Sequence, residues 1–340
     1  MGKCKGACVM DSKKITIHDV ARIAGVSPTT VSRALSRPGR VNLDTAKRVR
    51  KIADELGYRT KALEPQEEEK LHGSIMTLAS DLKYPIFAEF LYGMQNRCLK
   101  NNFCLLTATT KENYDIERDT ILRTLPHVDG FIFTMARISD SAIRKVATMK
   151  PTVIMNREVG GVQAIICDDR PALYATVVRL KELGHTSLSY ISGPEASWQN
   201  GFRWQSLKTI CEREKIGLRQ ITGTIRGNIF SAKKAFRSYI QHPTSAVIAF
   251  NDLQAIELMD LFIAHGIKIP GDVSLIGIDD IPGNTSTKIP LTSIRIPRED
   301  MGAVAANRII ERILNKTSVN TTPIYCRSVF IERESIGPAK

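Results

Sequence analysis

The chain has 340 residues, a formal net charge of +13, and 43% hydrophobic against 24% charged residues. This composition is typical of a globular protein with an ample core, and the length predicts a small domain plus one or two larger ones. No apolar run approaches the ~20 residues of a membrane span, and the N-terminus lacks the apolar stretch of a signal peptide. We therefore expect a cytoplasmic protein with no membrane contact.

The cysteines argue against disulfides and metal sites. They number seven, and Cys104, Cys167 and Cys326 lie inside apolar runs, which predicts buried free thiols. Cys4 and Cys8 have no second pair of ligands at zinc-finger spacing. We therefore expect no metal and no cofactor.

The N-terminal region is expected to comprise an extension at residues 1–12 and a compact head at residues 13–61. Apolar spacing, caps and breakers predict three short helices in the head, over His18–Ala24, from Pro28 to about Leu35 with Ser27 as its cap, and from Asn42 or Asp44 to Gly57. Gly25-Val26 makes a tight turn between the first two helices. This pattern is typical of a helix-turn-helix, which places its second helix in a DNA major groove.

The charge of the head favours a nucleic-acid partner. Between Lys13 and Lys61 there are twelve Lys or Arg and four acidic residues, a balance of +8. A plain three-helix bundle with a solvated basic face would share the geometry. Concentrated positive charge with Ser, Thr and Asn interleaved is what phosphate neutralisation requires, so the sequence predicts binding to double-stranded DNA.

After residue 73 the chain changes to short apolar runs that alternate with amphipathic helices. Strands are predicted at Ile75–Ala79, Cys104–Ala108, Gly130–Thr134, Thr152–Met155 and Ala164–Cys167, and again at Leu188–Ser192, Ala246–Phe250, Val273–Ile278 and Thr292–Ile296. Helices are predicted at Phe87–Leu99, Ala172–Leu183 and Leu253–Ala264. Two such series predict an α/β fold of two similar lobes, each a doubly wound parallel sheet with right-handed crossovers.

Six motifs in the same order resemble one family of proteins. The first is the run T-I-x-D-V-A-x-x-A-G-V-S-x-x-T-V-S-R-x-L from Thr16 to Leu35. The others are Leu183-Gly184-His185, Ile191-Ser192-Gly193-Pro194, Phe250-Asn251-Asp252, Ile276-Gly277-Ile278-Asp279-Asp280 and Arg333-Glu334-Ser335. Together they are similar to the lactose-repressor (LacI/GalR) family of bacterial transcription factors. The resemblance covers nearly the whole chain from about Ile15 onward.

The resemblance implies a periplasmic-binding-protein-like effector domain at residues 74–340. Lobe 1 would take about residues 74–171 and 297–327, and lobe 2 about residues 172–296 and 328–340, with chain crossings near Pro171, Pro297 and Arg327. It further implies a repressor that binds a near-palindromic operator as a homodimer, because doubling the few contacts of one head brings the affinity into the range of specific regulators.

In the head, we expect some residues to face base edges and others to hold phosphates. The base-facing group is Pro28, Thr29 and Arg33, and the DNA-contacting remainder is Thr16, His18, Ser27, Thr30, Ser32, Asn42 and Tyr58. Arg33 is the main expected specificity determinant, because a guanidinium can bind guanine O6 and N7 together, which is worth ~1–3 kcal/mol.

Effector candidates follow from the rule that ligands bind at the carboxyl ends of parallel strands, here between the lobes. Polar or aromatic residues near such ends are Asp81, Phe87, Asn156, Trp198, Arg203, Asn251 and Asp279. The resemblance implies effector contacts at Arg203, Asn251 and Asp279, with Asn156 weaker. Asn251-Asp252 can equally be a helix cap, Asp280 is expected to be structural, and Trp198 or Trp204 can stack on a sugar or pack in the core.

The expected effector is a carbohydrate or polyol, gripped by bidentate hydrogen bonds from amide, carboxylate and guanidinium groups. A purine is the alternative, since some relatives in the family bind nucleobases. Where such relatives stack an aromatic residue on the base, the alignment places Ile229, with Phe230 adjacent.

Residues 62–73 depart from the family pattern. Relatives usually carry a hinge helix here that inserts a leucine into the minor groove. The counterpart from Ala62 to Lys70 has Pro65, has Glu67 at the wedge position, and carries four acids against Lys70, a balance of −3. Carboxylates repel phosphates, so we predict a solvated linker that does not enter the groove. In an alternative alignment, Leu63 or Leu71 serves as the wedge.

Two other functions are alternatives to the ligand-responsive repressor. The chain has no GxGxxG after its first strand, no GxxxxGK[ST] and no GxSxG, and no nucleophile–base pair stands out, so no catalytic residues are expected. A sugar-modifying enzyme with an appended head would be revealed by turnover of a ligand. An architectural DNA binder, whose second domain mainly dimerises, would bind effectors weakly across a broad sugar panel.

Overall fold

The computed structural model describes residues 15–36, 41–56, 58, 71–223, 230–315 and 321–340. The chain divides into two compact units, residues 1–70 and residues 71–340. The expected N-terminal extension, Gly57, Ile229 and residues 62–70 of the expected linker lie outside the described residues. Among the helices that are described, none is both long and apolar enough to cross a membrane.

The head consists of three helices, as predicted: α1 (Ile17–Ala24), α2 (Pro28–Ser36) and α3 (Leu43–Glu55). A capping box begins α1, where Asp19 Oδ2 accepts bonds from the backbone N and the hydroxyl of Thr16. Asn42, rather than Asp44, caps α3, since its Oδ1 accepts a bond from the backbone N of Asp44 at 2.9 Å. A small apolar core holds the three helices together, formed by Val20, Ala21, Ala24, Val31, Ala34, Ala46, Val49 and Ala53.

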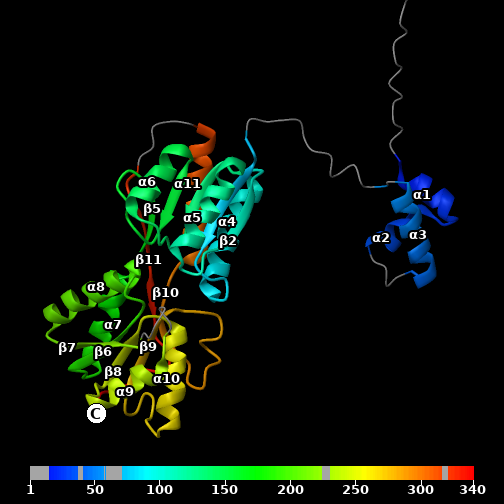
Figure 1. The fold of residues 1–340 in the computed structure, drawn as a ribbon. Coiled ribbons are helices and arrows are strands. Elements are labelled where there is room, and N and C mark those ends of the chain that lie inside the picture. The colour runs from blue at the N-terminus through cyan, green and yellow to red at the C-terminus, as the bar shows by residue number, and fades with distance from the viewer. Residues whose placement is uncertain (1–14, 37–40, 57, 59–70, 224–229, 316–320) are drawn as a thin grey trace, which may run out of the picture. The chain divides into compact units, whose positions relative to one another are not determined.

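The second unit contains two six-stranded sheets (Figure 1). The first has the order β11-β5-β4-β3-β1-β2 and is parallel throughout. Its strands are β1 (Ser74–Ala79), β2 (Cys104–Thr109), β3 (Gly130–Phe133), β4 (Thr152–Met155), β5 (Gln163–Asp168) and β11 (Ile324–Arg327). The sheet with its flanking helices is called lobe 1 from here on.

Lobe 2 contains the second sheet, of order β12-β10-β9-β8-β6-β7, in which only the pairing of β12 with β10 is antiparallel. Its strands are β6 (Ser187–Ser192), β7 (Gly217–Thr222), β8 (Ala246–Ala249), β9 (Ser274–Asp279), β10 (Thr292–Arg295) and β12 (Val329–Ile331). The chain passes between the sheets after β5, after β10 and between β11 and β12, close to Pro171, Pro297 and Arg327.

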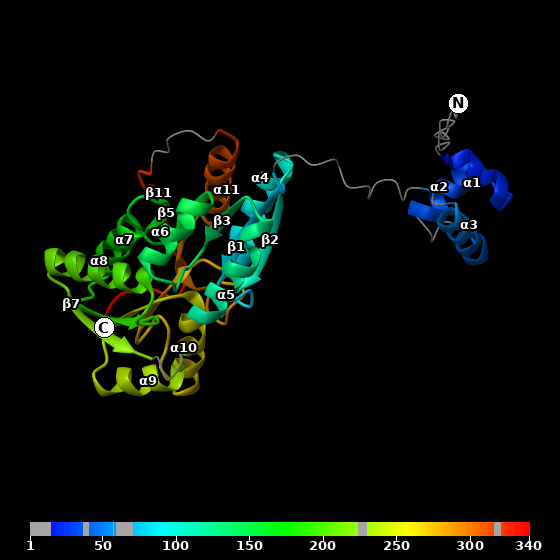
Figure 2. The ribbon, with the colours of Figure 1, turned by 45° about the horizontal axis from the view of Figure 1, so that its top comes forward.

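Helices cover both faces of each sheet, which buries the central strands completely (Figure 2). In lobe 1, α4 (Pro85–Lys100) and α11 (Arg298–Asn315) cover one face, and α5 (Tyr114–Thr124) and α6 (Asp140–Met149) cover the other. In lobe 2 the corresponding pairs are α7 (Arg170–Glu182) with α8 (Trp198–Glu214), and α9 (Ala232–Gln241) with α10 (Asp252–Ala264). A short 3-10 helix, η3 (Leu125–His127), follows α5.

The packing of α4 on α11 depends on two glycines. A Cβ atom on Gly93 would lie 2.0 Å from the carbonyl oxygen of Glu299, and a Cβ on Gly302 would lie 2.1 Å from that of Phe90. No side chain fits at either position, so the two backbones approach closely. The start of α11 is therefore held against the middle of α4.

Three strands and one cysteine differ from the sequence-based expectation. The predicted strands are all present within a residue or two. The strands β7, β11 and β12 were missed because they are short or mixed in polarity, and all three are edge strands with exposed positions. Cys104 is exposed rather than buried, because β2 is the opposite edge of its sheet, and Cys326 on β11 is half-buried. Cys167, on an inner strand, is buried as predicted.

Candidate functional site

The second helix of the head presents a polar surface away from its core. Val31 and Ala34 are fully buried, whereas Thr29 and Arg33, one helical turn apart, are exposed on the outer side of α2. Pro28 and Ser32 are half-exposed beside them. This arrangement leaves one guanidinium and short polar side chains available to base edges.

The expected phosphate-binding residues of the head differ in how exposed their side chains are. Thr16, His18, Ser27 and Asn42 are exposed, and Thr30, Ser32 and Tyr58 are half-exposed. Several already have an internal role: Ser27 Oγ accepts a bond from the backbone N of Thr30 at 3.1 Å and so caps α2. The Tyr58 ring packs against the head core.

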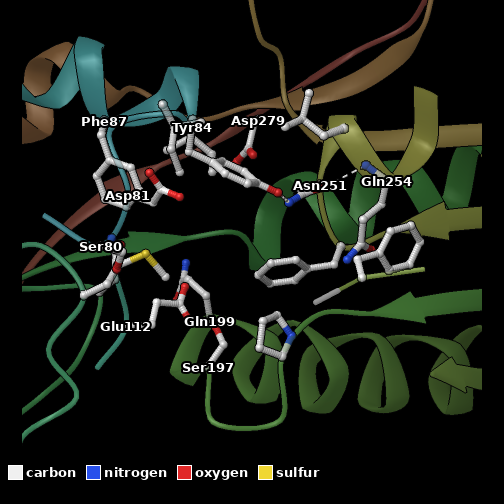
Figure 3. Close-up of a pocket in the computed structure, with 18 of the residues that line it drawn as sticks. Ser80, Asp81, Tyr84, Phe87, Glu112, Ser197, Gln199, Asn251, Gln254 and Asp279 are labelled. Atoms are coloured by element: carbon white, nitrogen blue, oxygen red, sulfur yellow. Dashed lines mark hydrogen bonds between the residues drawn. The ribbon is translucent and has the colours of Figure 1, made fainter. Parts of the chain in front are cut away.

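In the second unit, a cavity of about 360 Å³ lies between the two lobes, at the carboxyl ends of strands of both sheets (Figure 3). This volume is at the low end of the ~300–1,000 Å³ found for small-molecule sites. Six of the seven expected effector residues line it, namely Asp81, Phe87, Asn156, Arg203, Asn251 and Asp279.

Trp198 is the exception. It is 54% exposed, it does not line this cavity, and the Arg157 guanidinium lies over its ring at 6.0 Å. Trp198 is the first residue of α8, and its ring contacts Arg157 instead of the cavity. Trp204 is the packed tryptophan, stacked on the buried ring of Tyr190 with centroids 6.2 Å apart.

Arg203 forms a buried ion pair. Its Nε donates to Asp169 Oδ2 at 2.7 Å and its Nη1 donates to the carbonyl oxygen of Phe250 at 2.6 Å, with both side chains of the ion pair at most 3% exposed. Burial alone would lower the pKa of the guanidinium, and the carboxylates of Asp169 and Asp279 raise it overall. Arg203 is therefore a fixed cation whose position is set by lobe 2 itself.

Asn251 and Asp252 have different roles. Asn251 Oδ1 caps α10 by accepting a bond from the backbone N of Gln254 at 2.9 Å, and its Nδ2 donates to the hydroxyl of Tyr84 across the cavity. Asp252 is fully buried and accepts bonds from Ser293, Asn284 and the backbone N of Ile281. Asn251 thus joins the two lobes, while Asp252 holds the loops after β9.

Asp279 and Asp280 also differ. Burial raises the pKa of Asp279 to about 7, since the lowering effect of Arg203 and Arg298 does not outweigh it. Although burial opposes the effect, ion pairs with Arg295 and Arg333 hold the pKa of Asp280 below its usual value. Asp280 is structural, as expected, and Asp279 faces the cavity with a backbone φ of 124°, a strained conformation of the kind found at functional sites.

Sequence reasoning missed several cavity residues, chiefly Tyr84, Glu112, Arg137, Gln199, Gln254, Glu257 and Arg298. Position after a strand could have indicated Tyr84, Glu112 and Arg137, which follow β1, β2 and β3. Gln254 and Glu257 follow Asn251 at helical spacing on α10. No local signal marks Arg298, which lies 2% exposed at the start of α11 and bridges Glu89 on α4 to the backbone oxygen of Asp279.

Comparison with known proteins identifies the family. Residues 16–61 match the family described as bacterial regulatory proteins, lacI family, and residues 177–336 match the periplasmic binding protein-like domain. The transcriptional repressor PurR of Vibrio vulnificus is 31% identical over 315 residues, which are 88% of this chain and 92% of that protein. The chain belongs to the lacI family.

Members of the lacI family are DNA-binding transcriptional regulators rather than enzymes, and this chain is a repressor of that family with an effector-binding domain. Solved structures show the same fold. A family regulator from Enterococcus faecium with bound ribose has a TM-score of 0.68 at 24% identity, covering 78% of this chain and all of that one. The lac repressor dimer bound to operator has a TM-score of 0.69 at 20% identity, covering 95% and 99%.

Proposed function

We propose that this lacI-family repressor is controlled by a carbohydrate bound in the cavity between its lobes. The observation that carries the proposal is the lobe 2 wall, where Arg203, Asn251 and Asp279 converge on one small cavity lined on the lobe 1 side by Phe87 and Phe90. A polar wall opposite aromatic rings suits a hydroxyl-rich ring with one polar edge and one apolar face. Ribose in the Enterococcus faecium relative supports the same class of ligand.

A nucleobase is the second candidate, and two observations favour it. The relatives named PurR match most of this chain. Phe230 and Phe250 both line the cavity, so aromatic faces are present on lobe 2 even though Ile229 lies outside the described residues. A flat base between aromatic side chains would use the same carboxylate and amide groups.

Thermal-shift screening separates the two candidates. The purified chain is tested against sugars, sugar phosphates and nucleobases, since a ligand that binds the folded state raises the melting temperature by mass action. We expect at least one sugar to raise it and to change operator binding. Tight binding of a purine base with no active sugar would refute the carbohydrate assignment.

For the head, we propose that Arg33 selects one base position. Arg33→Ala is expected to relax the preference at that position in a binding-site selection, with Arg22→Ala as the matched control. Arg22 is an equally basic residue on α1 that pairs with Asp19 at 3.6 Å. Unchanged sequence preference in Arg33→Ala would contradict the assignment.

We further propose a two-fold homodimer on a near-palindromic operator. Tyr92 and Leu99, two turns apart on α4, are 60% and 61% exposed, which is the kind of apolar surface that a second copy covers. Light scattering at micromolar concentration is expected to show a dimer, and a Tyr92→Glu, Leu99→Glu variant a monomer. A monomeric chain with full operator binding would contradict the proposal.

The linker proposal concerns how DNA is bent. Leu71 packs against the core of the second unit, and the backbone N of His72 donates to Asp129 at 2.9 Å, so Leu71 is held by its own domain. We propose that residues 62–72 do not enter the minor groove and that the operator bends little. A sharp central kink in circular-permutation assays, lost in Leu63→Ala or Leu71→Ala, would show the opposite.

A further inference from the structure

The cavity is lined by more carboxylates than free cations. Asp81, Glu112, Glu257 and Asp279 are its acidic residues, and Arg137, Arg203 and Arg298 are its basic ones. Resting on the function proposed above, in which this cavity holds the effector, we propose that the effector carries a protonated amine, as an amino sugar does. The proposal rests on the ion-pair and hydrogen-bond partners of these charged side chains.

All three guanidinium groups already have protein carboxylate partners. Arg203 pairs with Asp169 at 2.7 Å, Arg298 pairs with Glu89 at 3.0 Å, and Arg137 pairs with Glu112 at 2.8 Å. Asp169 and Glu89 are not themselves part of the cavity lining, so they add two negative charges beside the cavity. A ligand therefore meets arginines whose charge is neutralised by the protein itself.

The carboxylates are less well compensated. Among the described residues, Asp81, Glu257 and Asp279 have no Lys or Arg within ion-pair distance of their carboxylate oxygens. Burial raises the pKa of the Tyr84 hydroxyl, and the negative charges of Asp279, Glu257 and Glu112 raise it further, against a lowering effect of the hydrogen bond from Asn251. These three acids come from α10, from β9 and from the loop after β2, so negative charge approaches this hydroxyl from both lobes.

Two buried oxygen atoms at the same cavity lack partners. Ser80 is 2% exposed and Gln254 is 4% exposed, and neither Ser80 Oγ nor Gln254 Oε1 has a hydrogen-bond partner in the part of the chain that the structure describes. Both residues line the cavity, from opposite lobes (Figure 3). Because a buried unpaired polar atom is costly, these atoms indicate a ligand with hydrogen-bonding groups on both sides. The Gln254 carbonyl oxygen needs a donor from the ligand, and the Ser80 hydroxyl can accept from it or donate to it.

A third unpaired atom at the cavity requires a different hydrogen-bonding group from the ligand. Arg137 Nε is a buried donor that has no partner among the described residues, so the ligand also needs an acceptor near lobe 1. An ammonium group together with hydroxyl groups satisfies both needs. Tyr84 and Phe87 line the same cavity as Asp81 (Figure 3), and a cation is stabilised by aromatic faces as well as by carboxylates. A phosphate would meet uncompensated carboxylates, and so would be repelled.

Isothermal titration with matched sugars tests this proposal. For each of glucose, galactose and mannose, the full chain is titrated with the parent sugar, its 2-amino derivative, its N-acetylated 2-amino derivative and its 6-phosphate. In at least one series we expect the amine to bind tenfold or more tightly than the parent sugar and the N-acetyl derivative, and the phosphate to show no binding. The N-acetyl derivative keeps a nitrogen substituent at the same carbon but has no positive charge, so it shows whether the charge itself is recognised.

Variants assign the preference to the cavity acids. Asp81→Asn and Glu257→Gln, which each remove one cavity carboxylate, are each expected to reduce the ratio of amine to parent affinity at least fivefold. Asp115→Asn, on the exposed first turn of α5, is the matched control. Because the two substitutions are at separate positions, one variant still tests the proposal if the other does not fold.

The outcomes separate this inference from the function on which it rests. If the parent sugar or the phosphate binds as tightly as the amine in every series that shows binding, the inference is overturned and the carbohydrate-responsive repressor still stands. No binding of any sugar, with binding of a nucleobase, overturns both. An amine preference that survives in both Asp81→Asn and Glu257→Gln also overturns the inference.

Discussion

The two lobes have nearly the same topology but prepare their sides of the cavity differently. On lobe 2, Arg203 is locked by Asp169, Asn251 caps a helix, and Asp252 holds the following loops through three hydrogen bonds. On lobe 1, Ser80 Oγ has no partner within the described chain, and Asp81 accepts a bond from the backbone N of Lys83 in its own loop.

This difference shows which wall is preorganised. Polar groups that are fixed by buried partners keep their geometry without a ligand, so lobe 2 offers a preformed surface. Polar groups that lack partners gain most when a ligand arrives. Among the described cavity residues these are Ser80 Oγ and Arg137 Nε on lobe 1 and Gln254 Oε1 on lobe 2, so lobe 1 is the side that we expect to respond more. The Tyr84–Asn251 bond and Arg298 connect the two walls.

The largest expected effect is from breaking the fixed wall. Arg203→Ala leaves the Asp169 carboxylate buried without its cation, and is expected to destabilise the chain by about 3–5 kcal/mol. Arg137→Ala, the matched change on lobe 1, removes a pair whose side chains are 12% and 29% exposed, and is expected to cost about 1 kcal/mol or less. Urea denaturation measures both. Equal losses would contradict the difference between the lobes.

The second effect concerns Asp279 and depends on pH. Its folded-state pKa of about 7 lies above its ordinary value of 3.8, so the folded chain binds more protons than the unfolded chain in this window, and its contribution to stability is lost as pH rises through it. Asp279→Asn is therefore expected to stabilise the chain by on the order of 2 kcal/mol at pH 8 and hardly at all at pH 4. The charged groups facing Asp279 are Arg203, Arg298, Asp252 and Asp169.

Asp280 is the internal control for this prediction. Its pKa is lowered by ion pairs with Arg295 and Arg333, so its stabilising contribution is present above its unfolded-state pKa and is lost as pH falls. Asp280→Asn should therefore destabilise at pH 7, opposite in sign to its neighbour. Thermal melts from pH 4 to pH 8 measure both variants, and the same sign for the two at neutral pH would refute the separate roles assigned to them.

The smallest effect is from the bond that joins the two walls. Tyr84→Phe removes the hydroxyl that accepts from Asn251 Nδ2, and is expected to lower stability by about 1 kcal/mol. It should also increase the radius of gyration of the ligand-free chain in small-angle scattering, because the lobes lose a direct connection. Tyr114→Phe, at an exposed position on α5, is the control and should change neither quantity.

Much of the molecule follows from local sequence. The capping of α2 by Ser27, the start of that helix at Pro28 and the alternation of buried strands with helices are set by neighbours in the chain, so the three-helix head and the two doubly wound sheets could be predicted. The rule that strands end at a ligand site placed six of the seven expected residues at the cavity. Trp198 does not line this cavity, because the direction of a side chain at a helix start depends on packing as well as on position in the sequence.

What the sequence determined by itself was the kind of element at each position and the edge of each sheet at which polar residues gather. Tertiary structure alone decided their electrostatic roles. Arg203 meets Asp169 from 34 residues away, and Arg298 meets Glu89 from 209 residues away. Because Coulomb interactions and burial depend on distance in space, two adjacent aspartates, Asp279 and Asp280, acquire pKa values shifted in opposite directions.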